Sequence, residues 1–182
     1  MAFLGRSSPK IRIGSSLTLG QTLLPVYLTC LKRDILEIES GNLDFAIVEG
    51  NVKSNYVNCV KLDSDKLVAV CSVLFKAPES ITILELSTYP LLLREIGSAS
   101  RDLFEHQLSL HGVSVNPIME SASNHVLVKN AEVGLGITIL PNYLVKDAIN
   151  NGSLREVLIL DCEMTRDHFL ICHKNKKSNS YQ

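Results

Sequence analysis

The sequence predicts an α/β fold in which short strands alternate with helices along the chain. The first observation is a series of short, strongly apolar segments, such as 67–71 and 91–93, typical of strands that are buried on both faces. The second is that segments with apolar residues at helical spacing lie between them. The third is that Gly112 and Gly134 follow such segments, where a left-handed cap residue is expected. This alternation indicates α/β architecture with mainly parallel sheets, in one sheet or in two.

The N-terminal third of the chain contains the first strands and an extended helical pattern. Residues 1–9 combine Gly, Ser-Ser and Pro and are expected to be a linker or an expression remnant. Pro25 suits the first turn of a helix, because its ring presets the backbone and its missing N–H is not needed there. The expected elements are a strand at 11–14, a helix around Pro25, a helical tail at 35–40 closed by Gly41, and strands at 45–48 and 67–71.

The rest of the chain repeats the pattern of strand, turn and helix. Leu103, Phe104 and Leu108 share one face of an expected helix that follows the polar turn at 97–100. Asn151 and Gly152 end a later helix. The expected elements are helices at 81–87, after the turn at 97–100, at 124–133 and at 143–149, and strands at 91–93, 117–120, 136–140, 154–160 and 168–172.

Two polar turns, at 15–18 and 97–100, each follow an expected strand and open an expected helix. The free N–H groups at a helix start, with a hydroxyl beside them, form an anion-binding arrangement. If the two turns face each other across a cleft, they would hold a small carboxylate, sulfate or phosphate from both sides. The alternative is that their hydroxyls are ordinary N-caps, which stabilise a helix by about 1 kcal/mol.

Composition and charge exclude several classes of protein. The chain has 182 residues, of which 46% are hydrophobic, which is enough for one domain or two small lobes with a real core. The net charge is −1, so no basic surface for nucleic acid is expected. The N-terminus lacks the apolar core of a signal peptide, and no apolar run approaches the roughly 20 residues of a membrane span. We therefore expect a cytoplasmic protein that does not bind membranes.

The five cysteines do not form a recognisable motif. None of them is part of a C-x-x-C pair, so neither a zinc site nor a redox motif is indicated. Most are flanked by Val, Leu or Ile, and we expect them to be small buried side chains in a reducing compartment. No metal and no cofactor is expected.

Five segments, in this order along the chain, resemble the effector-binding domain of LysR-type transcriptional regulators. They are residues 11–16, 23–25, 41–50, 93–101 and 134–141. The resemblance implies two Rossmann-like lobes of the type II periplasmic-binding-protein fold, joined by two crossover segments. On this basis lobe I would comprise residues 10–74 plus 168–182, and lobe II would comprise residues 75–167.

The resemblance also implies which residues contact the effector. In this family the effector lies in the cleft between the lobes, beside the turns that follow the strands. The matching positions here are the two polar turns, the end of the strand at 45–48 and the start of the helix at 124–133. The implied ligand-binding residues are Ser15, Ser16, Thr18, Glu49, Gly50, Ser98, Ser100, Ser121, Ser123 and Asn124.

Some of these assignments are evenly balanced against a structural role, Ser121 and Asn124 among them. Two arginines beside the second polar turn, Arg94 and Arg101, would suit bidentate contacts to an anion. Their alternative is a surface charge paired with Glu95 or Asp102, and for Arg101 we favour the structural alternative.

The function implied by the resemblance is that of an effector-sensing regulatory domain without catalysis. It would bind a small, anionic metabolite in the interlobe cleft and thereby modulate a DNA-bound homodimer or tetramer of a full-length protein. DNA would be reached only through a helix-turn-helix, and no such pattern precedes Ile11 in this chain. The family places an edge strand between Thr29 and Leu36, where this sequence has no room for one, through either a deletion or missing residues. That region usually contributes to dimerisation.

Two alternatives use the same two-lobed scaffold. An enzyme would need a nucleophile with a base, or an acid and base pair, in the cleft. His125 begins a helix beside the expected cleft, but we favour an exposed side chain there, and Glu49 lacks a second carboxylate at useful spacing. A free solute-binding protein would need a signal peptide, which the sequence does not show.

Overall fold

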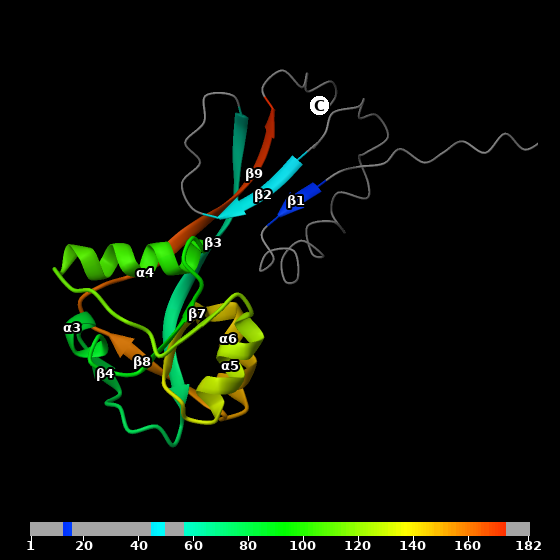
Figure 1. Ribbon diagram of the computed structural model, residues 1–182. Coiled ribbons are helices and arrows are strands. Elements are labelled where there is room, and N and C mark those ends of the chain that lie inside the picture. Colours follow the sequence, from blue (N-terminus) through cyan, green and yellow to red (C-terminus); the bar gives the residue numbers. More distant parts are fainter. Residues whose placement is uncertain (1–12, 16–44, 50–56, 174–182) are drawn as a thin grey trace, which may run out of the picture. The chain divides into compact units, whose positions relative to one another are not determined.

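The computed structural model describes residues 13–15, 45–49 and 57–173. The chain divides into two compact units (Figure 1). Unit 1 comprises Met1–Asp63 and Asp167–Gln182, and unit 2 comprises the continuous stretch Ser64–Arg166. Two strands, β3 (Val57–Ser72) and β9 (Thr165–His173), each contain one of the boundaries. The chain therefore passes between the units twice, once within each strand.

Unit 1 contains a sheet of parallel and antiparallel strands. Strand β1 (Ile13–Ser15) pairs in parallel with β2 (Phe45–Glu49), and β2 pairs antiparallel with β9. The strands predicted at 11–14, 45–48 and 168–172 correspond to these three elements. The predicted linker at 1–9, the helical pattern between residues 23 and 40, and the short segment between Thr29 and Leu36 lie outside the described residues.

Unit 2 is built on a sheet in which β3, β7 (Ile137–Pro141), β5 (Leu91–Arg94) and β6 (Met119–Ser121) follow one another. Strand β8 (Leu154–Ile159) pairs with β3, and β4 (Ser80–Ile81) pairs with β8. Strand β5 is parallel to both β6 and β7, whereas β3 is antiparallel to both β7 and β8. The expectation of mainly parallel sheets is thus wrong for β3, whose ladders to β7 and β8 are both antiparallel.

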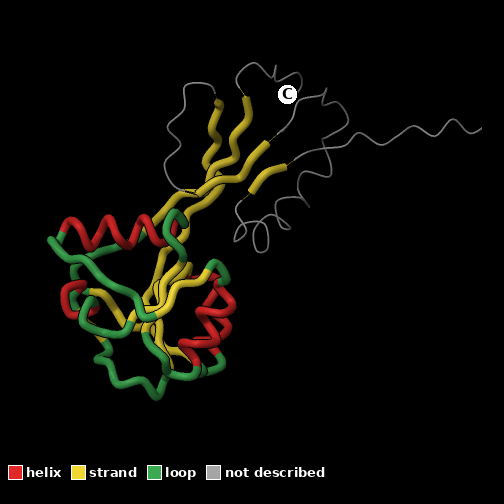
Figure 2. Tube along the Cα trace, viewed as in Figure 1, coloured by secondary structure: helices red, strands yellow, loops and turns green. Residues whose placement is uncertain are grey.

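The helices of unit 2 pack on both faces of this sheet (Figure 2). They are α3 (Ile83–Leu86), α4 (Ala99–Leu110), α5 (Asn124–Glu132) and α6 (Asn142–Asn150), and all four were predicted. Alternate residues of β3 point to opposite faces, so Ala69 packs in one apolar cluster and Val70 in the other.

Each face of the sheet has its own apolar core. Helices α3 and α4 contribute Ile83, Leu86, Phe104 and Leu108 to one cluster, and α5 and α6 contribute Leu127, Ala131, Val145 and Ala148 to the other. The predicted face of α4 is confirmed, because Phe104 and Leu108 are each 1% exposed and Leu103 packs against the same cluster.

Strand β3 is much longer than the predicted segment at 67–71. It extends from Val57 to Ser72, but only its C-terminal part, from Leu67 onward, is continuously buried. The preceding residues are mostly exposed and include Lys61, Asp63 and Lys66. Because an exposed polar strand lacks an apolar pattern, the sequence indicated only the buried end of β3.

Two glycines have backbone requirements that other residues would not meet. Gly112 follows α4 with a φ of 69°, as the predicted left-handed cap requires. Gly136 comes directly before β7, and a Cβ placed on it would lie 2.3 Å from the backbone oxygen of Pro90. The backbone of Pro90 therefore approaches β7 at a distance that only glycine permits.

The cysteines only partly match the expectation of buried side chains. Cys71 is buried, Cys162 and Cys172 are half-buried, and Cys59 is exposed. The expectation is wrong for Cys59, because the part of β3 that contains it is exposed. Burial raises the pKa of the Cys162 thiol, which disfavours the reactive thiolate. Cys30 lies outside the described residues.

Among the residues that the structure describes, no helix has the length and apolar character needed to cross a membrane.

Candidate functional site

The candidate site in unit 2 is the edge of the sheet where β5 and β6 end. These strands are parallel, and Arg94 at the end of β5 is in register with Ser121 at the end of β6. Helix α4 begins shortly after β5, and α5 begins shortly after β6. The two helix starts therefore lie at the same edge, where ligands commonly bind in α/β sheets. This edge brings together the predicted residues Ser98, Ser100, Ser121, Ser123 and Asn124.

The start of α4 is capped by Ser98. Its hydroxyl oxygen accepts a hydrogen bond from the backbone N–H of Arg101 at 3.2 Å, and its carbonyl accepts from the N–H of Asp102 at 2.9 Å. The N-cap alternative considered for Ser98 is therefore present in the structure. Capping uses a lone pair of the hydroxyl oxygen, and the hydroxyl hydrogen stays available to an acceptor.

Ser100, in the first turn of α4, has very different surroundings from those of Ser98. It is 4% exposed, and its hydroxyl oxygen accepts a hydrogen bond from Nη1 of Arg166 at 3.2 Å. Arg166 is itself 5% exposed and belongs to β9. Arg166, which is 66 residues away from Ser100 in the chain, therefore contacts the predicted site directly.

The start of α5 is held by short-range hydrogen bonds. The hydroxyl of Ser121 accepts from the backbone N–H of Ser123 at 3.1 Å. The hydroxyl of Ser123 accepts from the N–H of Val126 at 3.4 Å, so Ser123 is the N-cap of α5. None of these three residues is buried.

Arg94 connects the two helix starts. Its Nε and Nη2 donate to the two carboxylate oxygens of Glu95 at 2.7 and 2.9 Å, and its Nη1 donates to Oδ1 of Asn124 at 2.8 Å. The guanidinium fork thus already binds a carboxylate bidentately. The pair with Glu95, which was one of the two interpretations of Arg94, is confirmed, but Arg94 is only 8% exposed and is not a surface charge.

Arg101 is also fully engaged by groups of unit 2. Its Nε donates to Glu105 at 2.5 Å, its Nη1 donates to the carbonyl of Arg94 at 3.1 Å, and Glu120 lies 3.4 Å away. The alternative favoured for Arg101, a surface charge paired with Glu95 or Asp102, is wrong in its details, because Arg101 is buried and its carboxylate partners are Glu105 and Glu120. The reason is that Arg101 is 4% exposed and directed inward, toward groups that the sequence does not place near it.

Carboxylates balance the buried arginines of the site. The hydrogen bond from Arg94 is the main cause that lowers the pKa of Glu95, so this carboxyl is ionised at neutral pH. Arg166 binds Asp65 through a similar bidentate pair. Attraction for an anion would therefore come from N–H and O–H groups at the helix starts, since each buried guanidinium here already has a carboxylate partner.

The predicted residues of unit 1 are only partly described. Ser15 is the last residue of β1, and Glu49 is the last residue of β2. Glu49 is half-buried and in register with His168 of β9, which is 1% exposed. Ser16, Thr18 and Gly50 lie outside the described residues.

Three histidines of unit 2, among them the candidate acid–base residue His125, have exposed side chains. His106, His111 and His125 are all exposed, as was expected for His125. The Nε2 atom of His111 lies 4.0 Å from a carboxylate oxygen of Asp161. Within the described ranges no cluster of three or more His, Cys, Asp or Glu side chains is arranged to hold a metal ion.

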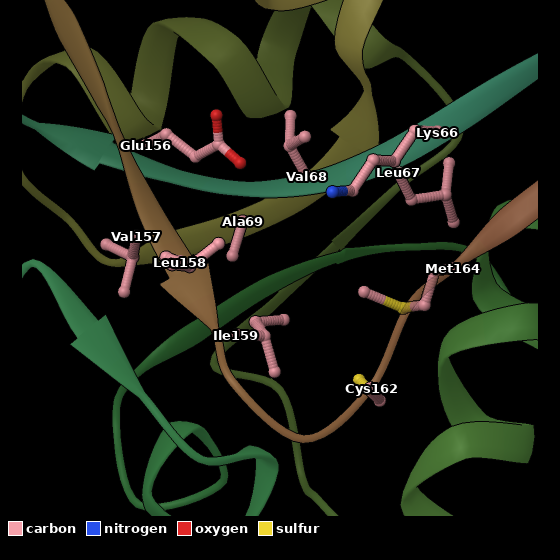
Figure 3. A pocket seen from close by; sticks show the side chains of 10 residues that line it. All are labelled: Lys66, Leu67, Val68, Ala69, Glu156, Val157, Leu158, Ile159, Cys162 and Met164. Carbon is pink, nitrogen blue, oxygen red and sulfur yellow. The ribbon is translucent and has the colours of Figure 1, made fainter.

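A small pocket occurs elsewhere in unit 2, between β3, β8 and the segment that leads to β9 (Figure 3). Its volume is about 20 Å³, and Ala69, Ile159, Cys162 and Met164 are among its lining residues. A cavity of this size holds about one water molecule. It is therefore too small for a metabolite, and it involves none of the predicted site residues.

Sequence reasoning missed Asp65 and Arg166, the two residues that connect Ser100 to the crossing strands. They are 101 residues apart in the chain and belong to no recognisable motif. A charged residue in a strand usually indicates a solvent-exposed face, and nothing in the local pattern distinguishes these two. Only the pairing of distant strands brings them together.

Comparisons with known proteins identify the family of the chain. Residues 26–181 match the sequence profile of the LysR substrate binding domain. The uncharacterized HTH-type transcriptional regulator YeiE of Escherichia coli strain K12 is 28% identical over 185 residues, an alignment that covers 91% of this chain and 62% of the relative. The chain thus spans about three-fifths of the length of this relative.

Solved structures show the same fold. The effector-binding domain of QuiR in complex with shikimate has a TM-score of 0.74 at 17% identity, covering 93% of this chain and 89% of that one. The regulatory domain of CcmR from Synechocystis PCC6803 in complex with 2-PG has a TM-score of 0.74 at 18% identity, with the same coverage. At this level of identity the likeness concerns the fold, which is the two-lobed, periplasmic-binding-protein-like architecture of effector-binding domains.

Proposed function

The chain belongs to the family of LysR substrate-binding domains, and from this premise we propose that it senses a small, anionic metabolite without transforming it. The match over residues 26–181 carries the proposal, because it covers most of the chain. Relatives in this family are transcriptional regulators. The ligand would act by its differential affinity for two arrangements of the regulator, since a ligand shifts an equilibrium only to that extent.

The α4 and α5 starts support the anionic character of the ligand. They present N–H groups and hydroxyls at one edge of the sheet, and this is the arrangement that binds carboxylate, sulfate or phosphate groups. Ser98, Ser100 and Ser123 are the residues of unit 2 that we propose as donors to the ligand. Ser15, Ser16, Thr18, Glu49 and Gly50 would contribute from unit 1.

The organisation of the protein is part of the same proposal. We propose that unit 1 and unit 2 correspond to lobes I and II, with the effector between them, and that a full-length protein acts as a homodimer or tetramer in the cytoplasm. Contact with DNA would be made through a helix-turn-helix of that protein. The structures of QuiR with shikimate and of CcmR with 2-PG support the view that the ligand is a small molecule.

The test is a thermal-shift screen of the chain with sulfate, phosphate, acetate, shikimate and 2-PG, followed by calorimetry. Binding to the native state alone raises stability by RT ln(1 + [L]/Kd), about 2.7 kcal/mol at a hundredfold excess over Kd. We expect a saturable shift from an anionic compound. We also expect Ser98→Ala to weaken its binding by about 1–3 kcal/mol, because the anion loses a donor.

Ser109→Ala is the matched control, because Ser109 belongs to the same helix but lies in its last turn and is exposed. Equal affinity in Ser98→Ala and Ser109→Ala would remove the assignment of the α4 start. Chemical consumption of the bound compound would instead indicate an enzyme on the same scaffold.

A further inference from the structure

We propose that Arg166 and Asp65 are positioning residues, which fix the hydroxyl of Ser100 as a donor to the ligand and connect the ligand site to the two strands that pass between the units. The inference rests on the proposed function, because it concerns the same site. It is carried by a chain of contacts from β3 through β9 to α4, all within unit 2.

The first observation is the geometry of the ion pair. Arg166 donates from Nε and Nη2 to the two carboxylate oxygens of Asp65 at 2.7 and 2.8 Å, and both side chains are buried, with exposed fractions of 3% and 8%. A bidentate pair fixes the plane of the guanidinium. The remaining nitrogen, Nη1, is thereby aimed at Ser100, 3.2 Å from its hydroxyl oxygen.

The second observation concerns the direction in which the Ser100 hydroxyl forms hydrogen bonds. A guanidinium can only donate, so the contact with Arg166 uses a lone pair of the Ser100 oxygen. In the part of the chain that the structure describes, no acceptor is bonded to the Ser100 O–H. The single hydrogen of this buried hydroxyl can therefore be donated to a group that accepts, such as an oxygen of an anion.

The third observation is the place of the ion pair along the chain. Asp65 lies two residues after the end of the first segment of unit 1, and Arg166 is the last residue of unit 2. The pair therefore joins the two crossing strands beside the points where they pass between the units. A backbone hydrogen bond also joins these two parts of the chain nearby, since the N–H of Leu67 in β3 donates to the carbonyl of Met164, just before β9, at 2.8 Å.

Energetics favour positioning over simple stabilisation. A buried ion pair loses most of its Coulomb energy to desolvation, and apolar residues of similar volume often stabilise a fold equally well. A second ion pair, Lys61–Asp167, also joins β3 to β9 but is exposed, with exposed fractions of 54% and 37%. It makes the same connection at the surface, where the loss of one partner costs little.

The test measures three variants against the parent. They are a double variant that carries both Asp65→Leu and Arg166→Met, the single variant Arg166→Lys, and the control Lys61→Met. The double variant removes both charges of the Asp65–Arg166 pair. Arg166→Lys keeps the positive charge, but an ammonium group cannot bind Asp65 bidentately and Ser100 at the same time, as the guanidinium does. The first readout is amide hydrogen exchange along α4 in the free chain. The second is the Kd for inorganic phosphate, measured by calorimetry.

In the double variant and in Arg166→Lys we expect amides of the first turn of α4, such as Arg101 and Asp102, to exchange about tenfold faster, with little change in the last turn. A purely structural role would instead raise exchange along the whole helix with the loss of global stability. Where the parent binds phosphate, we expect both variants to bind about tenfold more weakly, the change that loss of one hydrogen bond to a charged group gives. Lys61→Met should match the parent in both readouts.

The two proposals fail separately. First-turn exchange equal to that of the parent in both variants would overturn the positioning role, whatever binds. A parent chain that does not bind phosphate would count against the anionic ligand of the proposed function, while the exchange measurement would still decide the role of Arg166. Should the double variant fail to fold, Arg166→Lys alone decides it.

Discussion

The starts of α4 and α5 lie at one edge of the same sheet and have the same sequence signature, a strand followed by a serine N-cap, yet they are held in different ways. At the start of α4, Ser100 and Arg101 are 4% exposed, and Arg166 contacts Ser100 from a distant strand. At the start of α5, Ser121 and Ser123 bind each other and the adjacent backbone. The local sequence thus places a serine N-cap at both helix starts, and at the α4 start Ser100 is also bonded to a residue that is 66 positions away in the chain.

This difference suggests a division of roles at the candidate site. The α4 start has fixed donors, because Ser100 is buried and bonded to Arg166 of β9, and half-buried Ser98 is bonded to the backbone of its own helix. The α5 start is half-exposed and is connected to β5 mainly through Asn124, which accepts from Arg94. We expect the α4 start to determine affinity and the α5 start to adapt to the ligand.

The largest expected effect concerns the apolar cores on which α4 and α5 pack. A cavity in either core should destabilise the protein by a similar amount. Phe104 of α4 is 1% exposed and Leu127 of α5 is 0% exposed. Phe104→Ala and Leu127→Ala should each lower the free energy of unfolding by about 3–4 kcal/mol, because each leaves a cavity in a packed cluster. Urea denaturation measures this, with Leu110→Ala, at a side chain that is 65% exposed, as a control with little effect. Strongly unequal losses would place the difference in the core and not in the polar contacts.

The second effect should be specific to the α4 side. Arg166→Met leaves the carboxylate of Asp65 buried without its bidentate partner. The free energy of unfolding should fall by about 3 kcal/mol, since removing one member of a buried pair costs far more than the pair contributes. Urea denaturation of Asp65→Leu with Arg166→Met should show a smaller loss. If the single and double variants were equally stable, Asp65 would not depend on Arg166.

The third effect compares the two caps directly. Ser98→Ala should cost about 1 kcal/mol, and Ser123→Ala about half of that, because the Ser123 cap is exposed and its hydrogen bond is longer. Thermal denaturation with Ser109→Ala as reference would resolve the difference. Equal costs would mean that burial of the α4 start does not strengthen its cap.

The smallest effect is a pH dependence that arises from Arg94, which contacts both helix starts. The pKa of Glu95 lies below its ordinary value of 4.5, so the folded protein releases this proton at a pH where the unfolded chain still binds it. The resulting stability is present above pH 4.5 and is lost as the pH falls through the pKa of the folded state. Glu95 is 41% exposed, so after allowance for screening by solvent only a few tenths of a kcal/mol are expected.

Urea midpoints at pH 7 and pH 3 in the parent and in Arg94→Met would measure this contribution. The parent should lose slightly more stability on acidification than the variant. An identical loss in both would show that Glu95 titrates independently of Arg94.

Local patterns in the sequence were sufficient for most elements of unit 2. The apolar spacing of α4 predicted the burial of Phe104 and Leu108, and Gly112 was correctly assigned to a left-handed cap. The extent of β3 could not be predicted, because its N-terminal part is polar and exposed. A strand is recognised in a sequence by the apolar residues of its buried face, and the N-terminal part of β3 has few such residues.

The positions of the serines at the starts of α4 and α5 were predictable, but the contacts that support these helix starts were not. The serines at 98, 100, 121 and 123 were found because hydroxyls after strand ends have a known role at helix starts. The inward direction of Arg101 and the pairing of Asp65 with Arg166 depend on contacts between distant segments. No local propensity encodes such a contact, so the sequence left these arginines as surface charges or did not single them out.

The path of the chain through the two units has a consequence for the order in which they are completed during synthesis. Unit 2 is one uninterrupted stretch, Ser64–Arg166, whose two ends are hydrogen-bonded to each other between Leu67 and Met164. In unit 1, by contrast, β2 needs β9 as its antiparallel neighbour, and β9 is made last. Because a nascent chain emerges from its N-terminus, unit 2 has all its strands before β2 acquires this partner. Unit 1, whose first segment precedes unit 2, is therefore completed after unit 2, and until β9 is made the edge of β2 that β9 occupies stays open.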